Sequence, residues 1–463
     1  PTRRSSDLVA GEALGGGVRV VFALLLFFML LLLITVFMVS VAEAFINVPE
    51  LVIPTFGLVL IAMGMGWLVH RHHIDGRVVG AWGVFLAYGL IWVGNSHPVS
   101  LPQEWGPQVV LAVWFAAISA YCLLASVAPI WLILRPRDCI STAKLFIGML
   151  LGFAGLAVAR PLMQAPFSTG SFLAGGKPMW PMLFIIVACG AISGFHAVVS
   201  TGTTARQLDH EADARPIAFG GMVMEGVLAM LVLLVVAGGL KWGEAPAGVT
   251  GRAAELYFAT ALQENWIVAF GSGFGNLVSK LGIPYLGYAV AALLGSVMVK
   301  SFVLTTLDTG TRLARFLVSD GLGARVPLLR GKVAASLVIL VPAYVLAVTH
   351  SYGSIWRLFG SANQLTAAIT LLTATALLGR AKRPTLFTLV PAGFMLATSL
   401  AALVWEMFAP GSGSFTAPEK DWLLGSVSLV LLALGVAACI GYWRGVQSAP
   451  RAQGMNPLTF KRD

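Results

Sequence analysis

Charged residues are scarce in this sequence. Of its 463 residues, 11% are Asp, Glu, Lys or Arg, against about 25% in a typical soluble domain. The hydrophobic share is 58%, which exceeds the roughly 45–50% of such domains. These two values exclude an ordinary soluble enzyme and a disordered chain. They indicate a protein whose solvent is largely the lipid bilayer.

Several chemical signatures are absent as well. The four cysteines have no paired spacing, which argues against a disulfide framework and a zinc site. The sequence contains no phosphate-binding loop, no HExxH motif and no GxSxG motif. The net charge of +10 comes from basic residues in short loops rather than from a nucleic-acid-binding patch. We therefore expect no enzymatic activity, no cofactor, no metal and no nucleic-acid partner.

Long apolar runs make up most of the chain. A membrane-crossing helix needs about 20 apolar residues, and the sequence predicts about twelve such spans in an all-α, polytopic helix bundle. The predicted spans are Val20–Val41, Leu51–His70, Val78–Val93, Val109–Leu134, Cys139–Ala159, Met182–Val199, Ile217–Leu240, Tyr285–Thr306, Val333–His350, Ser361–Leu378, Thr385–Met407 and Trp422–Tyr442.

Basic residues are concentrated in alternate loops. The loop after Thr306 is rich in Arg, whereas residues 42–50 and 94–108 contain no Lys or Arg and carry Glu43, Glu50 and Glu104. Because cytoplasmic loops carry the excess of Lys and Arg, this pattern predicts an even number of crossings. Both termini of this multi-pass chain are then cytoplasmic.

Residues 241–284 do not fit a simple span. An amphipathic stretch, Arg252–Leu262, precedes the glycine-rich segment 271–275. We expect either an interfacial helix or gate, or an ordered external loop.

The two ends of the chain carry separate expectations. Residues 1–8 have no initiator Met and resemble the translation of a sequencing-adapter end, although a natural polar N-terminus is the alternative. We expect residues 9–445 to form the membrane domain and residues 446–463 to form a cytoplasmic tail.

The densest group of intramembrane polar residues surrounds two glycines. Gly190 and Gly194 flank an Ala-Ile-Ser stretch, and glycine weakens a helix interior by about 1 kcal/mol. The helix is therefore expected to unwind here and to offer backbone groups to a substrate or ion. Histidine is the side chain whose ordinary charge change falls near neutral pH, so His196 is a candidate proton carrier. The alternative is a patch of small residues for helix packing. The candidates in this group are Ser193, Gly194, His196, Thr201, Thr203 and Thr204.

A second group lies where the Tyr285–Thr306 span is predicted to end. Thr305, Thr306 and Asp308 offer the hard oxygen ligands of a cation site or proton relay. The alternative is a helix end at which Asp308 pairs with Arg312.

A third group opens the tenth predicted span. Ser361 is a plausible helix N-cap, which places Asn363 and Gln364 in the first turn. They are candidates for the ion path or are explained by capping alone. Glu225 and Lys300 also lie within apolar spans, and they either pair with each other or belong to an ion path.

Three motifs together resemble the carbon starvation protein A family of bacterial transporters. They are Cys189–His196 followed by Ser200–Thr204, Leu304–Arg312, and Leu358–Leu365. The turn Arg135-Pro-Arg-Asp138 is similar as well, as is Asp213-Ala-Arg215 with Gly220-Gly-Met222 beyond it. The resemblance covers residue 9 to about residue 440.

This resemblance implies a secondary active transporter that imports pyruvate or small peptides, driven by protons, in carbon-limited cells. It also implies the five-plus-five, LeuT-like inverted repeat of the amino acid–polyamine–cation transporters. The substrate and ion-path candidates that match the family pattern are Ser193, Gly194, His196, Thr201, Thr203, Thr204, Thr305, Thr306, Asp308, Asn363 and Gln364.

The chain departs from the family pattern at two points. Family members begin with further Gly/Pro-rich helices, so we expect this chain to be N-terminally incomplete. Lys300 stands where an apolar or small residue is expected. A nutrient sensor that binds substrate without transporting it is the main alternative function. An intramembrane enzyme is a weaker one, because no nucleophile or metal-ligand spacing supports it.

Overall fold

The computed structural model describes residues 16–448, apart from 168–172, 175–176, 244, 247, 250, 324 and 351. Residues 1–8 therefore lie outside the described part. Of the predicted tail, residues 446–448 continue the last helix and the remainder is not described. Helices joined by turns and loops make up the described chain, together with a two-residue antiparallel ladder of β1 (Leu173–Ala174) and β2 (Lys177–Pro178) and one isolated β-bridge between Lys241 and Tyr257. The predicted all-α class is thus confirmed.

Twelve helical segments are long and apolar enough to cross a membrane in the described part of the chain, as predicted. One of them is interrupted and comprises α7 and α8. The helices are α2 (Gly16–Asn47), α3 (Val52–His72), α4 (Gly76–Ser96), α5 (Pro107–Val127), α6 (Leu134–Ala159), α7 (Phe184–Ala191), α8 (Gly194–Gly202), α9 (Ala214–Gly239), α10 (Phe258–Glu264), α11 (Trp266–Val278), α12 (Tyr288–Gly321), α13 (Lys332–Thr349), α14 (Tyr352–Arg380), α15 (Leu386–Phe408) and α16 (Trp422–Ser448).

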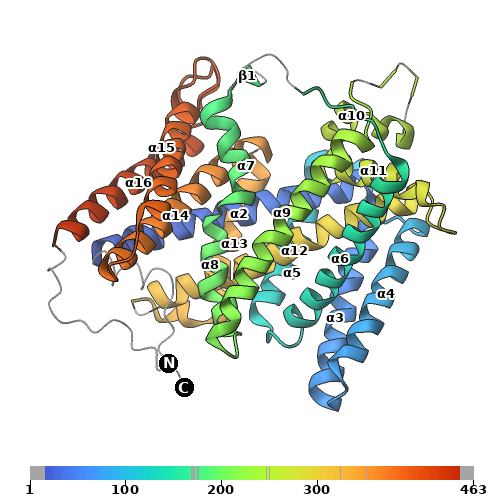
Figure 1. The fold of residues 1–463 in the computed structure, drawn as a ribbon, viewed down its shortest axis with the longest axis horizontal. Helices are drawn as coiled ribbons and strands as arrows, with labels where there is room; N and C mark the ends of the chain where they lie inside the picture. The colour runs from blue at the N-terminus through green and yellow to red at the C-terminus, as the bar shows by residue number, and fades with distance from the viewer. Residues whose placement is uncertain are drawn as a thin grey trace.

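Three helices form the centre of the molecule. In α2, α12 and α14, more than half of the apolar stretch that could span the membrane is buried inside the protein. In α9 only 11% of the corresponding stretch is buried. Figure 1 shows the α3–α4 hairpin at one end of the molecule and α15 with α16 at the other, with α2 running between these ends. The most hydrophobic helix is therefore also the one that joins the parts of the bundle.

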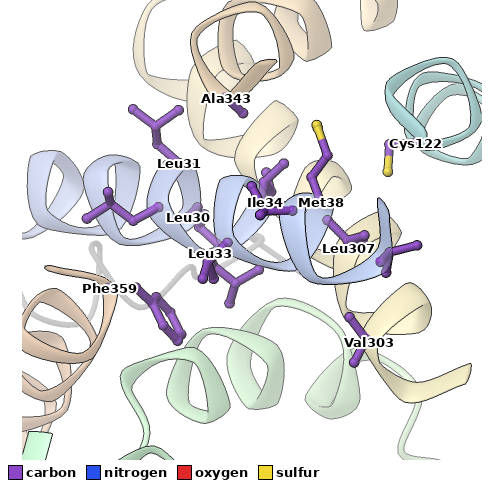
Figure 2. Packing of buried hydrophobic residues seen from close by; sticks show 14 of the residues in the cluster. Leu30, Leu31, Leu33, Ile34, Met38, Cys122, Val303, Leu307, Ala343 and Phe359 are labelled. Carbon is purple, nitrogen blue, oxygen red and sulfur yellow. The ribbon is translucent and has the colours of Figure 1, made fainter. Parts of the chain in front are cut away.

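Leucine-rich packing holds α2 in this position. Its mean hydropathy over the spanning window is 3.2. Figure 2 shows α2 side chains, including Leu33 and Ile34, among residues from four other helices. These are Val303 and Leu307 of α12, Phe359 of α14, Ala343 of α13 and Cys122 of α5. Because lipid tails are as apolar as leucine, close van der Waals packing rather than burial from water favours this contact.

Two helices extend well beyond their predicted bounds. The span expected to end at Thr306 continues in α12 as far as Gly321, and the span expected to begin at Ser361 begins in α14 at Tyr352. Charged side chains within these helices are buried by their neighbours. The hydropathy pattern therefore placed the end of α12 too early in the sequence and the start of α14 too late.

The amphipathic part of the segment 241–284 forms a 3₁₀ turn, Gly251–Leu256, and the short helix α10, and its interfacial or gating role stays a prediction. The segment is not a simple external loop. Its second half forms α11, whose residues are buried almost throughout and pack against α12, α9 and α6. At 13 residues and about 1.5 Å per residue, α11 spans roughly 20 Å and is too short to cross a bilayer. A Cβ on Gly275 would lie 2.8 Å from the Ala292 backbone nitrogen. This glycine therefore permits the close approach of α11 to α12.

Candidate functional site: a buried ion cluster and a broken helix

A buried carboxylate lies near the middle of α12. Asp308 has 0% exposure, and Arg137 of α6 donates to both of its oxygens, with Nη2 at 3.0 Å from Oδ1. The Tyr121 hydroxyl of α5 donates to Oδ2 at 2.7 Å and accepts from Arg137 Nη1. Three helices are thus joined through one carboxylate.

The Arg137 guanidinium is as buried as its partner, with 1% exposure. It also reaches Asp138, at 3.3 Å from Nη2 to Oδ1, and that second carboxylate is 52% exposed. Removing two charges from water is expensive, and close pairing with hydrogen bonds offsets that cost. Because Asp138 is a second acceptor at the edge of the cluster, Arg137 has an alternative partner if Asp308 becomes neutral.

The alternative pairing of Asp308 with Arg312 is wrong. Arg312 lies one turn further along α12 and instead donates through Nη2 to the carbonyl oxygens of Ala125 and Ala128, at 2.5 and 2.6 Å. These carbonyls belong to the end of α5, where helix carbonyls lack intrahelical partners. Arg312 therefore caps α5.

Sequence analysis selected Asp308 but not its two partners. Arg137 was assigned to a loop because the predicted span began at Cys139, whereas α6 begins at Leu134. Tyr121 lies in an apolar run and carries no local signal. The Arg135-Pro-Arg-Asp138 sequence, two basic residues before an acid at the start of a span, was the available signal for Arg137.

The neighbouring threonine hydroxyls bond within α12, and their place on an ion path stays a prediction. Thr305 and Thr306 both donate to the Phe302 carbonyl of their own helix, at 2.8 and 2.9 Å. Thr309 reaches Asp308 Oδ1 at 3.4 Å. Among the residues that the structure describes, no group of three or more His, Cys, Asp or Glu side chains could hold a metal ion.

The predicted unwinding of the helix at Ser193 is confirmed. Helix α7 ends at Ala191, Ser193 has extended backbone angles, and α8 begins at Gly194. Asn363 of α14 spans the break, because its Oδ1 accepts from the Phe195 amide at 2.9 Å and from the Ser193 hydroxyl at 3.1 Å. A side chain from another helix thus satisfies a backbone donor that the break leaves unpaired.

Close contact with α14 fixes the sequence at this break. A Cβ on Gly194 would lie 2.5 Å from the Asn363 carbonyl oxygen and from Thr366 Cβ, so any other residue would push the two helices apart. Gln364 extends the contact, since its Nε2 donates to the Phe184 carbonyl at 2.6 Å. Ser399 of α15 donates to Gln364 Oε1 at 3.5 Å.

Capping does not account for Asn363 and Gln364. Ser361 is not an N-cap, because it lies inside α14 and donates to the Arg357 carbonyl. The two amides are therefore mid-helix residues that hold α7 and α8 against α14. The polar group around Ser193 and the polar group that contains Asn363 are thus in contact at the break.

His196 lies away from the ion cluster's polar atoms. Its ring is 51% exposed and its Nε2 lies 3.9 Å from Glu225 Oε1, which belongs to a 42% exposed side chain of α9. The expected alternatives for Glu225 did not include this partner, and no pairing of Glu225 with Lys300 is present among the described residues. The imidazole and the carboxylate share an outer face of α8 and α9.

The remaining threonine candidates lie at the far end of α8. Thr201 donates to the Ala197 carbonyl at 3.0 Å. Thr203 follows the last residue of α8, and Thr204 begins a short 3₁₀ turn, Thr204–Arg206. This end of α8 approaches α12, since a Cβ on Gly202 would lie 2.6 Å from Leu313 Cδ2. The broken helix thus contacts the helix that carries Asp308.

A polytopic helix bundle with a discontinuous span and a charge pair buried at membrane depth is the architecture of a membrane transporter. The family model described as "Carbon starvation protein CstA" matches residues 3–259 and 252–402. The chain belongs to this family. In its described part, twelve helical segments are long and apolar enough to cross a membrane.

Named relatives support the assignment. The chain is 30% identical over 458 residues to the pyruvate/proton symporter BtsT of Escherichia coli, a match covering 83% of this chain and 63% of the relative. It is 32% identical over 377 residues to the peptide transporter CstA of the same organism, covering 69% and 52%. The matched part therefore spans between half and two thirds of these relatives.

Solved structures give a weaker likeness. A manganese transporter mutant from Eremococcus coleocola aligns with 95% of this chain and 92% of its own, at 14% identity and a TM-score of 0.39. A likeness of this size carries no argument about the repeat. The five-plus-five inverted repeat stays a prediction.

Proposed function

We propose that this transporter imports a small carboxylate, either pyruvate or a short peptide, together with protons. The bacterial plasma membrane is its proposed location, with both termini of the chain in the cytoplasm. The named relatives support this choice of cargo, because they are a pyruvate/proton symporter and a peptide transporter.

The buried Asp308–Arg137 pair is the observation that carries proton coupling. Protonation of Asp308 removes its negative charge, after which Arg137 retains Asp138 as its partner on the exposed side of the cluster. Protonation of Asp308 would therefore shift the Arg137 guanidinium, which links α6 to α12, from Asp308 toward Asp138. Such a charge change biases two arrangements of the helices, which is what coupling requires.

The broken helix is the proposed moving part. Among the described residues, the side chain of Asn363 is what bonds the Phe195 amide and the Ser193 hydroxyl to α14, so a rotation of α8 would have to break these two bonds. Substrate would bind along α12, which the far end of α8 contacts, and Asp308 on the same helix would respond to it. His196 is a second proposed proton carrier, and the remaining proposed path residues are Gly194, Thr201, Thr203, Thr204, Thr305, Thr306 and Gln364.

Uptake into proteoliposomes tests the proposal. The protein encoded by the complete open reading frame is reconstituted, an inward proton gradient is imposed, and labelled pyruvate and labelled dialanine are added separately. We expect accumulation of one of them, collapse of that accumulation by a protonophore, and its loss in Asp308→Asn. Equal uptake with and without the protonophore contradicts proton coupling.

A second outcome separates a sensor from a transporter. Saturable binding of either compound to the purified protein, without accumulation in proteoliposomes, would contradict the transport proposal and support the sensor. Unchanged uptake in both Asp308→Asn and His196→Ala would exclude these two residues as the proton carriers.

A further inference from the structure

Lys300 is a buried amine for which the described residues provide no hydrogen-bond acceptor. It lies on α12, two helical turns from Asp308, and has 1% exposure. Its Nζ is without a hydrogen-bond partner among the described residues and lies 3.2 Å from the centroid of the Phe45 ring. An ammonium group has three donors and no acceptor, and an aromatic face does not accept all three.

Lys144 shows how a structural lysine is accommodated at the same level of the bundle. It lies on α6, has 3% exposure, and donates a 2.6 Å hydrogen bond to Ser301, the residue after Lys300. Lys300 has no such hydroxyl. An unpaired charge buried in a membrane protein is costly and marks a functional path more often than a packing position.

A cavity lies against α12, and one of its lining residues is a single helical turn from this amine. It has a volume of about 140 Å³, and Ser296 and Leu293 of α12 and Asn47 at the end of α2 contribute to its lining. Lys300 follows Ser296 by one turn on the same helix. Phe45 precedes Asn47 by two residues on α2. Neither Lys300 nor Phe45 lines the cavity itself, but each lies within about one turn of a lining residue on its own helix.

Phe45 lies over the Lys300 amine and would have to move before a ligand could reach that group. Its ring stacks on Phe56 at 5.6 Å and contacts Trp114 at 4.7 Å, centroid to centroid. The same ring covers the Lys300 ammonium. A change of rotamer within this aromatic group would replace the Lys300–Phe45 contact with an opening toward the cavity.

We propose that Lys300 binds the carboxylate of the substrate, and that the cavity above it is the chamber through which the substrate arrives after Phe45 moves. Carboxylate oxygens accept charge-assisted hydrogen bonds from an ammonium group, which is the partner that Lys300 lacks. This inference rests on the proposed function and adds to it the residue that recognises the cargo.

The cavity lining bears on which carboxylate is bound. Glu50 and Glu255 also line it. A peptide brings an ammonium group as well as a carboxylate, whereas pyruvate brings a carboxylate alone. The volume is below the roughly 300 Å³ at the lower end of pockets for drug-sized ligands, so either cargo is small. Both present the group that Lys300 would bind, and the experiment separates them.

Calorimetric titration of the purified protein tests the inference. The probes are pyruvate and dialanine, each compared with its neutral amide, pyruvamide and dialanine amide. The variants are Lys300→Met, which keeps the length without the charge, and Lys280→Met as a control on an exposed external lysine. We expect Lys300→Met to weaken binding of the free acid at least tenfold and to leave binding of its amide unchanged. Lys280→Met should behave as the unaltered protein.

Thermal stability separates recognition from packing. Because Met replaces a buried amine that lacks an acceptor, Lys300→Met should melt at the same temperature as the unaltered protein or higher. A lower melting temperature with unchanged preference for the acid over the amide would show a structural lysine and overturn the inference.

The two proposals can fail separately. Uptake of a carboxylate with the same KM in Lys300→Met would overturn the Lys300 site and leave the transport proposal standing. Carboxylate binding that needs Lys300, in a protein that accumulates nothing, would retain the site and overturn transport. No binding of either acid by the unaltered protein would overturn the Lys300 site.

Discussion

Arg137 on α6 and Asp308 on α12 are 171 positions apart in the sequence and form a bidentate pair in the interior of the helix bundle. Lys144, seven residues after Arg137 on α6, bonds to Ser301, seven residues before Asp308 on α12, so the two helices run antiparallel here. One interface thus holds a paired charge and a partly satisfied one. Lys300, beside Ser301, has no acceptor at all among the described residues.

Removing one partner of the Arg137–Asp308 ion pair is expected to destabilise the protein more than removing both. Arg137→Met leaves the Asp308 carboxylate buried without its cation, and breaking a buried pair in this way costs about 3–5 kcal/mol. The double variant Arg137→Met/Asp308→Leu replaces both charges with apolar groups and should recover most of that loss. Denaturant unfolding in mixed micelles measures both free energies.

A matched arginine controls this comparison. Arg325 is exposed in the segment after α12, and Arg325→Met should change the free energy of unfolding by less than about 0.5 kcal/mol. A double variant as unstable as Arg137→Met would show that the pair does not act as a unit.

Tyr121 is expected to stabilise the charged form of Asp308. Tyr121→Phe removes the hydroxyl that donates to Oδ2 at 2.7 Å and leaves the ion pair and the ring in place. Hydrogen bonds to charged groups contribute about 1.5–3 kcal/mol, so a loss of this size is expected. Tyr344→Phe is the control, because the Tyr344 hydroxyl makes a longer bond of 3.4 Å to a carbonyl. Equal losses in the two variants would contradict a special role for Tyr121.

Asn363 is expected to hold the broken helix in place through its oxygen. Asn363→Leu leaves the Phe195 amide and the Ser193 hydroxyl without their acceptor, at a cost of about 1–3 kcal/mol for each buried group left unpaired. Asn363→Asp keeps an acceptor at that position, so the amides at the break should stay as protected as in the unaltered protein. Hydrogen exchange at residues 192–195 measures this, with faster exchange expected in Asn363→Leu only. Identical exchange in all three proteins would show that Asn363 does not fix the break.

Gly275 is expected to be needed for the close packing of α11 against α12. In Gly275→Ala the new Cβ would lie 2.8 Å from the Ala292 backbone nitrogen, and overpacking of this kind costs about 1–3 kcal/mol. The control is Gly226→Ala on α9, where nothing lies within 4 Å of the new atom. That change should stabilise the protein by up to about 1 kcal/mol. A fall in thermal stability in both variants would contradict the packing argument.

The number and order of the spans could be predicted from sequence because membrane helices must satisfy their backbone internally and present apolar side chains to lipid. The break at Ser193 was predictable for a related reason, since glycines inside an apolar run weaken the helix locally. Helix ends were less predictable. Arg137 and Asp308 neutralise each other across an interface, so a polar residue that ended a predicted span lies in fact within a continuous helix.

Contacts between distant segments could not be predicted from single runs of sequence. Nothing near Tyr121 indicates Asp308, and nothing near Asn363 indicates the amide of Phe195. The same holds for α11. Its glycine-rich sequence suits a loop, and only the close approach of Ala292 to Gly275 explains why glycine is needed in a helix here. Each of these features depends on how helices are placed beside one another, which local composition does not encode.

Proton movement driven by substrate is the most direct test of the central claim. The protein is reconstituted into liposomes that contain a pH-sensitive dye, and pyruvate or dialanine is added outside without a pH gradient. The account predicts acidification of the lumen by the unaltered protein, beyond that in protein-free liposomes, and none of this excess in Asp308→Asn. Substrate accumulation without acidification, or equal acidification by Asp308→Asn, would contradict the account.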